Sequence, residues 1–82
     1  MKMKINRLDI LLLQLLNSNE CVDKFGGMTI SEMLEIGGLG CRNNVYLRLK
    51  SLLSEGLIEK GVIDNHADTY YLTGKGKQII SS

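Results

Sequence analysis

The segment from Met28 to Lys60 constrains the fold of this chain more than any other stretch. It reads MTISEMLEIGGLGCRNNVYLRLKSLLSEGLIEK, and apolar residues recur at helical spacing on both sides of its glycine cluster. Glycine ends helices because it adopts the left-handed conformation at little cost. The segment therefore predicts a short helix, a tight turn over residues 37–40, and a longer helix that ends at Gly56 before a strand.

The shorter helix carries its own start signal. Thr29 and Glu32 have the spacing of a capping box, in which the hydroxyl accepts from the Glu32 amide and the carboxylate accepts from the Thr29 amide. The apolar positions that follow are Ile30, Met33 and Leu34. Leu39 is apolar inside the glycine turn, so we expect it to plug the space between the two helices rather than face solvent.

The longer helix, residues 41–55, has two different faces. Its apolar face is expected to hold Val45, Tyr46, Leu49, Leu52 and Leu53. The opposite face carries Asn43, Asn44, Leu47, Ser51 and Ser54, flanked by Arg48 and Lys50. No acidic residue occurs between positions 41 and 54. A short helix, a tight turn and a helix with a polar, basic outer face form the pattern of a helix-turn-helix, whose second helix enters the DNA major groove.

A further helix is predicted at residues 5–17, ahead of this segment. Its main apolar face comprises Ile5, Leu8, Leu12, Leu15 and Leu16, with Ile10 and Leu13 further round and Asn6, Arg7, Asp9 and Gln14 on the polar side. This apolar arc is wider than one small core needs. Two interpretations stay open: a central helix buried on two sides, or a dimer interface. The interface would comprise Ile5, Leu8, Ile10, Leu12 and Leu13, together with Leu47 of the longer helix.

The remainder predicts a β-hairpin and a last helix. Residues 57–64 and 69–72 read as strands around a turn at 65–68, and Thr73 is expected to cap a short terminal helix. In the loop 18–27 we expect Phe25 to point inward, and Met28 to add an edge-strand residue. The fold class is α+β and mostly α, with a three-helix core, a two-stranded hairpin and a C-terminal helix in one domain spanning residues 1–82.

Composition adds limits to this interpretation. The formal net charge of +1 is weak support for nucleic-acid binding, so the local clustering of basic residues matters more than the total. Two cysteines in 82 residues do not form a disulfide framework. The first sixteen residues imitate a signal peptide, but Asp9 and Gln14 interrupt the apolar run and no small-residue cleavage site follows. We therefore expect a soluble, cytoplasmic protein without a membrane partner.

Two local signatures resemble known DNA-binding proteins. The pattern Val45-x-x-x-Leu49-x-x-Leu52-Leu53-x-x-Gly56-Leu57-Ile58 is similar to the recognition helix and exit of MarR-, ArsR- and PadR-like repressors. The pattern Tyr70-x-Leu72-Thr73-x-x-Gly76 is similar to the strand and cap that close their wing. The chain thus resembles a winged helix-turn-helix protein, and its small size resembles the centromere-binding adaptors of tubulin-type plasmid and phage partition systems.

This resemblance implies a homodimer that binds specific double-stranded DNA, with transcriptional regulation or repression as the main interpretation. The first alternative is a centromere-binding adaptor of a partition system, with a filament-forming protein as partner. The second alternative is a winged-helix module that binds another protein, for which Leu47 and the low net charge are the support.

We predict two sets of DNA contacts. The recognition-helix residues expected to meet base edges are Arg42, Asn43, Asn44, Leu47, Arg48 and Ser51. The residues expected to contact the DNA backbone are Lys50, Lys60, His66, Lys75 and Lys77. Asparagine pairs well with adenine and arginine with guanine, whereas lysine contacts to phosphate add affinity without sequence information.

Alternatives remain open at several of these positions. Asn43 and Asn44 also suit a helix start chosen for capping. Leu47 also suits a contact with a partner protomer. Each lysine is also explained by simple solvation, and His66 by an exposed turn without a function.

Enzymatic and metal chemistry find little support in the sequence. It contains no recognisable acid pair, no nucleophile with a base and no phosphate-binding glycine loop, so neither catalysis nor a cofactor is expected. Cys21 and Cys41 lie 20 positions apart with one distant histidine, too few ligands for zinc. A redox role for Cys41, next to Arg42 at a helix start, stays open because that setting lowers the pKa of a thiol.

Overall fold

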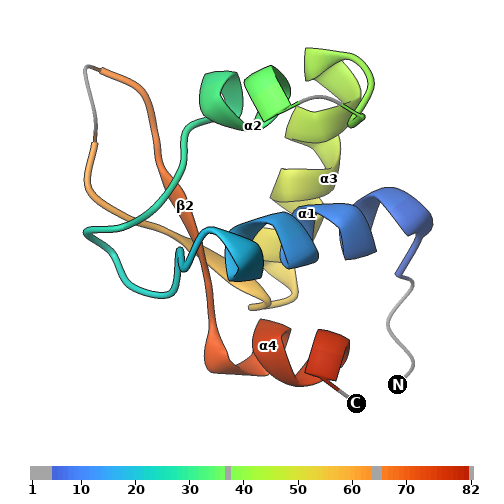
Figure 1. The fold of residues 1–82 in the computed structure, drawn as a ribbon, viewed down its shortest axis with the longest axis vertical. Coiled ribbons are helices and arrows are strands. Elements are labelled where there is room, and N and C mark those ends of the chain that lie inside the picture. Colours follow the sequence, from blue (N-terminus) through green and yellow to red (C-terminus); the bar gives the residue numbers. More distant parts are fainter. Residues whose placement is uncertain (1–4, 37, 64–65, 82) are drawn as a thin grey trace.

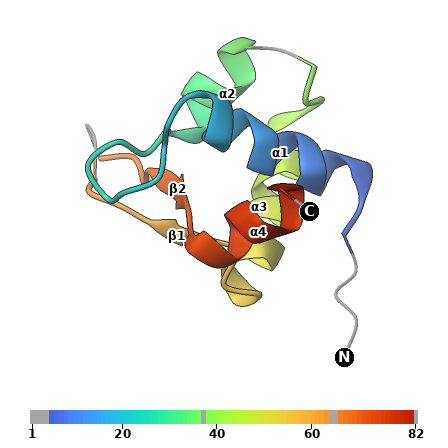
Figure 2. The same ribbon diagram turned by 60° about the horizontal axis from the view of Figure 1, so that its bottom comes forward.

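The computed structural model describes residues 5–36, 38–63 and 66–81, and within these ranges the chain forms four helices and a two-stranded hairpin. The elements are α1 (Arg7–Ser18), α2 (Ile30–Ile36), α3 (Arg42–Ser54), β1 (Ile58–Lys60), β2 (Tyr70–Leu72) and α4 (Gly74–Ser81). Helix α1 runs between α2 and α4, and the hairpin projects away beside the start of α2 (Figures 1 and 2). This is the expected α+β architecture. None of the helices in the described ranges has the length and apolarity to cross a bilayer.

Helix α1 supplies the centre of the core. The side chains of Leu12, Leu13 and Leu16 are fully buried, and they pack with residues of α2, α3 and both strands. The prediction that Leu12 and Leu13 belong to a dimer interface is therefore wrong. A side chain with no exposed surface in its own protomer has no area left to bury against a second one.

The start of α1 also differs from the expectation. Asn6 and Asp9 form a capping box: the Asn6 Oδ1 accepts from the Asp9 amide at 2.9 Å, and the Asp9 Oδ2 accepts from the Asn6 amide at 3.1 Å. Asp9 was expected on the polar side of this helix, but its side chain is fully buried. A buried carboxylate requires a partner of opposite charge.

The helix-turn-helix segment forms as predicted. The Thr29 amide donates to the Glu32 carboxylate at 2.9 Å, and the Glu32 amide donates to the Thr29 hydroxyl at 3.2 Å, which confirms the capping box. Gly38 and Gly40 both have positive φ, at 78° and 90°, a conformation that favours glycine. Leu39 between them is buried against the core, which confirms the plug. Gly37 lies outside the described residues.

The hairpin is shorter than expected but firmly attached. Ile58 pairs with Leu72 and Lys60 with Tyr70 in antiparallel register, and Met28 forms the expected edge bridge to Tyr70 on its other side. The strand predicted to reach residue 64 ends early because the Val62 amide donates to the carbonyl of Lys24 in a neighbouring loop, at 2.9 Å. Residues 64 and 65 of the expected strand and turn lie outside the described residues.

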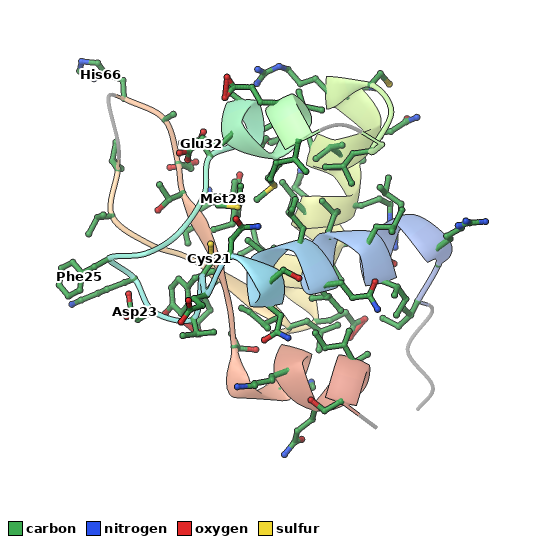
Figure 3. The ribbon with its side chains drawn as sticks, viewed as in Figure 1. Cys21, Asp23, Phe25, Met28, Glu32 and His66 are labelled. Carbon is green, nitrogen blue, oxygen red and sulfur yellow. The ribbon has the colours of Figure 1, made fainter. Side chains whose placement is uncertain are left out.

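The loop before α2 turns its aromatic residue outward. Phe25 was expected to point inward, but it is 76% exposed and projects into solvent (Figure 3). The Asp23 carboxylate accepts from the amides of Phe25 and Gly26, both at 2.9 Å, and holds this tight turn. Cys21 occupies the buried position of the loop instead, and its carbonyl accepts from the Leu72 amide at 2.6 Å.

Helix α4 is held against the exit of α3 by two residues of the second sequence signature. The Thr73 hydroxyl accepts from the Gly76 amide at 3.1 Å and donates to the Gly56 carbonyl at 2.7 Å, so Thr73 caps α4 as predicted. Gly76 packs so closely that a Cβ there would collide with the carbonyl of Leu57. The signature Thr73-x-x-Gly76 therefore has a structural reason: a cap followed by a close backbone contact.

Candidate nucleic-acid interface

Helix α3 exposes one long face. Val45, Leu49 and Leu52 are buried in the core. At about 3.6 residues per turn, the positions opposite them share one side of the helix. These positions are Asn43, Leu47, Lys50 and Ser54, and all four are exposed. The structure thus places Lys50 within the outward face rather than at its edge, and Ser51 at the margin, where it is half-buried.

The first turn of α3 is the most open part of this face. Arg42, Asn43 and Asn44 are all exposed, and no acidic residue occurs in the turn. The N-cap residue is Cys41, which makes no side-chain capping hydrogen bond. Arg42 donates to the Ser31 hydroxyl at 2.9 Å, which ties its guanidinium to α2. The asparagines do not provide the cap, so their amides are free for a ligand.

The structure turns Arg48 away from this face. Its Nε donates to Asp9 Oδ1 at 2.7 Å and its Nη2 to Asp9 Oδ2 at 2.8 Å, a bidentate pair between α3 and α1. The Asp9 side chain is fully buried and that of Arg48 is 29% exposed. The hydrogen bond to Asp9 raises the pKa of Arg48, against the opposing effect of burial. Arg48 is therefore the counter-ion of a buried carboxylate, and the structure removes it from the predicted base-reading set.

Tyr46 lies on the opposite flank of α3 from Arg48. It was expected in the core, but it is 44% exposed. With Ile30 and Arg42 it lines two hollows between α2 and α3, one of which extends to the hairpin. Sequence reasoning missed this residue because a tyrosine at helical spacing from Val45 and Leu49 reads as core.

The hairpin supplies a second group of exposed polar side chains. Lys60 forms an ion pair with Asp68 at 3.2 Å, and both side chains stay about half exposed. The hydrogen-bonded contact with Asp68 raises the pKa of the Lys60 ammonium. His66 is exposed, lies at the far end of the wing in Figure 3, and adopts a positive φ of 69°. Lys60 and His66, the two wing residues predicted to contact the DNA backbone, are thus both accessible.

Lys75 and Lys77 do not share a surface with the start of α3. The Lys75 ammonium donates to the carbonyl of Glu55, directly after the last residue of α3, at 3.0 Å. Helix α3 has 13 residues, so its two ends lie about 20 Å apart at the usual rise per residue. Helix α4 accordingly lies at the opposite end of the molecule from α2 (Figure 1). The structure therefore separates these two lysines from the other predicted DNA contacts.

The predicted dimer residues fall into three groups. Leu12 and Leu13 are core residues, as described above. Ile5 and Leu8 are half-buried and pack against the core, whereas Ile10 is half-buried and is not among the side chains that pack there. Leu47 is 52% exposed on α3.

The part of the chain that the structure describes holds no assembled metal site. Within the described residues, no three His, Cys, Asp or Glu side chains cluster as metal ligands would. Cys41 is exposed and Cys21 is buried. Burial raises the pKa of the Cys21 thiol, and the nearby carboxylates of Glu32 and Asp23 raise it further.

Two helices joined by a tight turn, an outward α3, a β-hairpin wing and a capping α4 define a winged helix-turn-helix protein. Comparison with solved structures finds the same fold in TubR from Bacillus megaterium pBM400. The TM-score is 0.85 and the identity 23%, over 96% of this chain and 86% of that one. No protein-family model matches the sequence, and no curated protein does.

Proposed function

We propose that this chain binds specific double-stranded DNA through the start of α3. The observation that carries the proposal is the open first turn of that helix, with Arg42, Asn43 and Asn44 exposed on a winged-helix scaffold. In helix-turn-helix proteins the amino-terminal residues of the recognition helix contact base edges. Lys50, Lys60 and His66 lie on accessible surfaces from which they would contact the phosphate backbone.

Between the two uses of such a module, we favour DNA partition over transcriptional regulation. The likeness to TubR extends over nearly the whole length of both chains, and the small size of this chain resembles that of the centromere-binding adaptors of plasmid and phage partition systems. A partition adaptor also requires a second partner, a filament-forming protein, and we extend the proposal to that partner.

The proposal includes a homodimer that presents two copies of α3. Its interface would form on α1, where Ile10 is half-buried and is not among the side chains that pack on the core. Short DNA-binding domains gain affinity and specificity when two protomers contact two half-sites. Because Leu12 and Leu13 belong to the core, this interface is smaller than the sequence alone indicated.

Fluorescence anisotropy with labelled duplex DNA tests the proposal. The duplexes come from selection of bound fragments out of the host DNA. We expect Arg42→Ala with Asn43→Ala to weaken specific binding at least tenfold, because two base contacts of roughly 1–3 kcal/mol each are lost. Binding by the wild type should also weaken steeply as salt rises, since phosphate contacts release counterions.

The chain offers a matched control for this double variant. Lys77 and Gln78 are likewise an adjacent cation and amide, both exposed, but they lie on α4 at the other end of the molecule. We expect Lys77→Ala with Gln78→Ala to leave the affinity within about twofold of wild type, a range that corresponds to less than the worth of one base contact. Equal losses in both double variants would show that α3 is not the reading helix.

The selected fragments also separate partition from transcription. Tandem repeats of one short site favour a centromere, because a partition complex loads many protomers side by side. A single site near a promoter favours a repressor. Binding that does not respond to salt would instead support a protein-interaction module, since it would not involve phosphates.

A further inference from the structure

A notch opens beside the first turn of α3, and its lining was not expected from the sequence. It has a volume of about 440 Å³ and is lined by Ile30 of α2 and by Arg42, Asn43 and Tyr46 of α3. We call this hollow the Tyr46 notch. Helix α2 lies directly beside the start of α3 at this point (Figure 1). The notch is therefore part of the surface that we propose contacts DNA.

The lining divides into apolar walls and a polar rim. The half-buried Ile30 and the ring of Tyr46 supply the walls, and the surface of the notch is mostly apolar. Arg42 and Asn43 supply the polar groups. The Ser31 hydroxyl accepts one of the five guanidinium hydrogens of Arg42, at 2.9 Å, which orients that side chain and leaves other donors available.

These chemical groups select among the bases. In the major groove, thymine is the base that presents a methyl group, and its O4 acceptor lies next to that methyl. A notch with apolar walls and donors at its rim matches both features. Guanine, adenine and cytosine present no methyl group in the major groove, so Arg42 and Asn43 would match their polar edges while the apolar walls of the notch would find no partner.

We propose that the Tyr46 notch receives the 5-methyl group of a thymine, and that Tyr46 is a specificity-determining residue for the bound DNA sequence. This proposal rests on the proposed DNA-binding function and adds the base that one part of the interface recognises. The ring of Tyr46 packs on the methyl, Ile30 closes the other side, and Arg42 or Asn43 donates to the neighbouring O4.

Uracil substitution tests the proposal at the level of one methyl group. In a selected duplex, each thymine is replaced in turn by deoxyuridine, which keeps the base pair and O4 and removes only the methyl. We expect one thymine in each half-site at which the wild type loses roughly fourfold in affinity, the value of one buried methylene-sized group. Other thymines should change the affinity less.

The same duplexes are then measured with three variants. In Tyr46→Ala the thymine and uracil duplexes should bind equally, because the wall that contacts the methyl is gone. Tyr46→Phe should keep the fourfold difference, since the ring remains. Val22→Ala should also keep it: Val22 is an exposed apolar residue outside α3 that does not line the notch. Tyr46 is 44% exposed, so truncation should preserve the fold, which circular dichroism checks.

The outcomes separate this proposal from the proposed function. Salt-dependent, sequence-specific binding with no uracil effect at any position would overturn the thymine assignment and leave the DNA-binding function intact. A uracil effect that persists undiminished in Tyr46→Ala would overturn the role of Tyr46. Absence of duplex binding by the wild type would overturn both.

Discussion

The pair between Asp9 and Arg48 is the residue-scale feature with the largest energetic consequence. The carboxylate is fully buried and accepts three hydrogen bonds, two from Arg48 and one from the Asn6 amide. Removing one partner of a buried pair leaves an uncompensated charge, whereas replacing both with apolar groups is often nearly neutral. The pair also constrains the rotation of α3 about its own axis relative to α1, because both guanidinium hydrogen bonds reach the same Asp9 side chain.

A double-mutant cycle measures this coupling. We expect Asp9→Asn to lower the free energy of unfolding by about 2 kcal/mol in urea titrations, because Arg48 loses its charged partner. In an Arg48→Met background, the same change should be neutral or stabilising, because it removes a buried charge that no longer has a counter-ion. Equal costs in both backgrounds would mean that the two side chains are not energetically coupled.

At the scale of the elements, the attachment of α4 depends on one glycine. A Cβ at Gly76 would meet the Leu57 carbonyl and the Leu72 side chain, whereas a Cβ at Gly74 would meet no atom within 4 Å. Both glycines lie in the same eight-residue helix. The two positions therefore differ in packing rather than in helix propensity alone.

Alanine at these two positions should have different effects on the stability of the fold. We expect Gly76→Ala to cost about 1–3 kcal/mol through overpacking, which corresponds to a fall in Tm of roughly 4–24 °C for a chain of this size. Gly74→Ala should be neutral or slightly stabilising, because alanine favours helix and finds open space. Thermal unfolding followed by circular dichroism measures both, and a Tm for Gly76→Ala at or above the wild-type value would contradict the close contact.

At the scale of the whole molecule, the proposed dimer depends on a small apolar surface of α1. Ile10 is half-buried on the flank of α1 and is not among the side chains that pack on the core, whereas Leu11, 37% exposed, lines a separate hollow with Ile36 and Leu39. Ile10 and Leu11 are adjacent in sequence and project from α1 in different directions. This arrangement offers a matched pair of substitutions.

We expect Ile10→Glu to yield monomers in sedimentation equilibrium and to weaken DNA binding at least tenfold, because the affinity of two linked half-site contacts is lost. Leu11→Glu introduces the same charge and should leave the wild-type assembly intact. If Leu11→Glu dissociates the protein and Ile10→Glu does not, the interface lies on the other side of α1.

The sequence by itself determined the elements and their ends. Both predicted caps, Thr29 with Glu32 and Thr73, form the expected hydrogen bonds, and Leu39 plugs the glycine turn. These features depend on residues a few positions apart, so local propensity and spacing are sufficient to predict them. The order of these helices and strands along the chain was then sufficient to predict the winged-helix fold.

Only the tertiary structure decided which side chains α3 presents. Arg48 pairs with a carboxylate 39 positions away, and this long-range contact accompanies the rotation that exposes Tyr46 and places Lys50 on the outer face. The same contact accompanies the burial of the Asp9 side chain. Periodicity defines the width of an apolar stripe but not the rotation of the helix against its neighbours, because that rotation depends on pairing between distant residues. For this reason, the Met28 to Lys60 segment predicted the recognition helix but not the notch beside it.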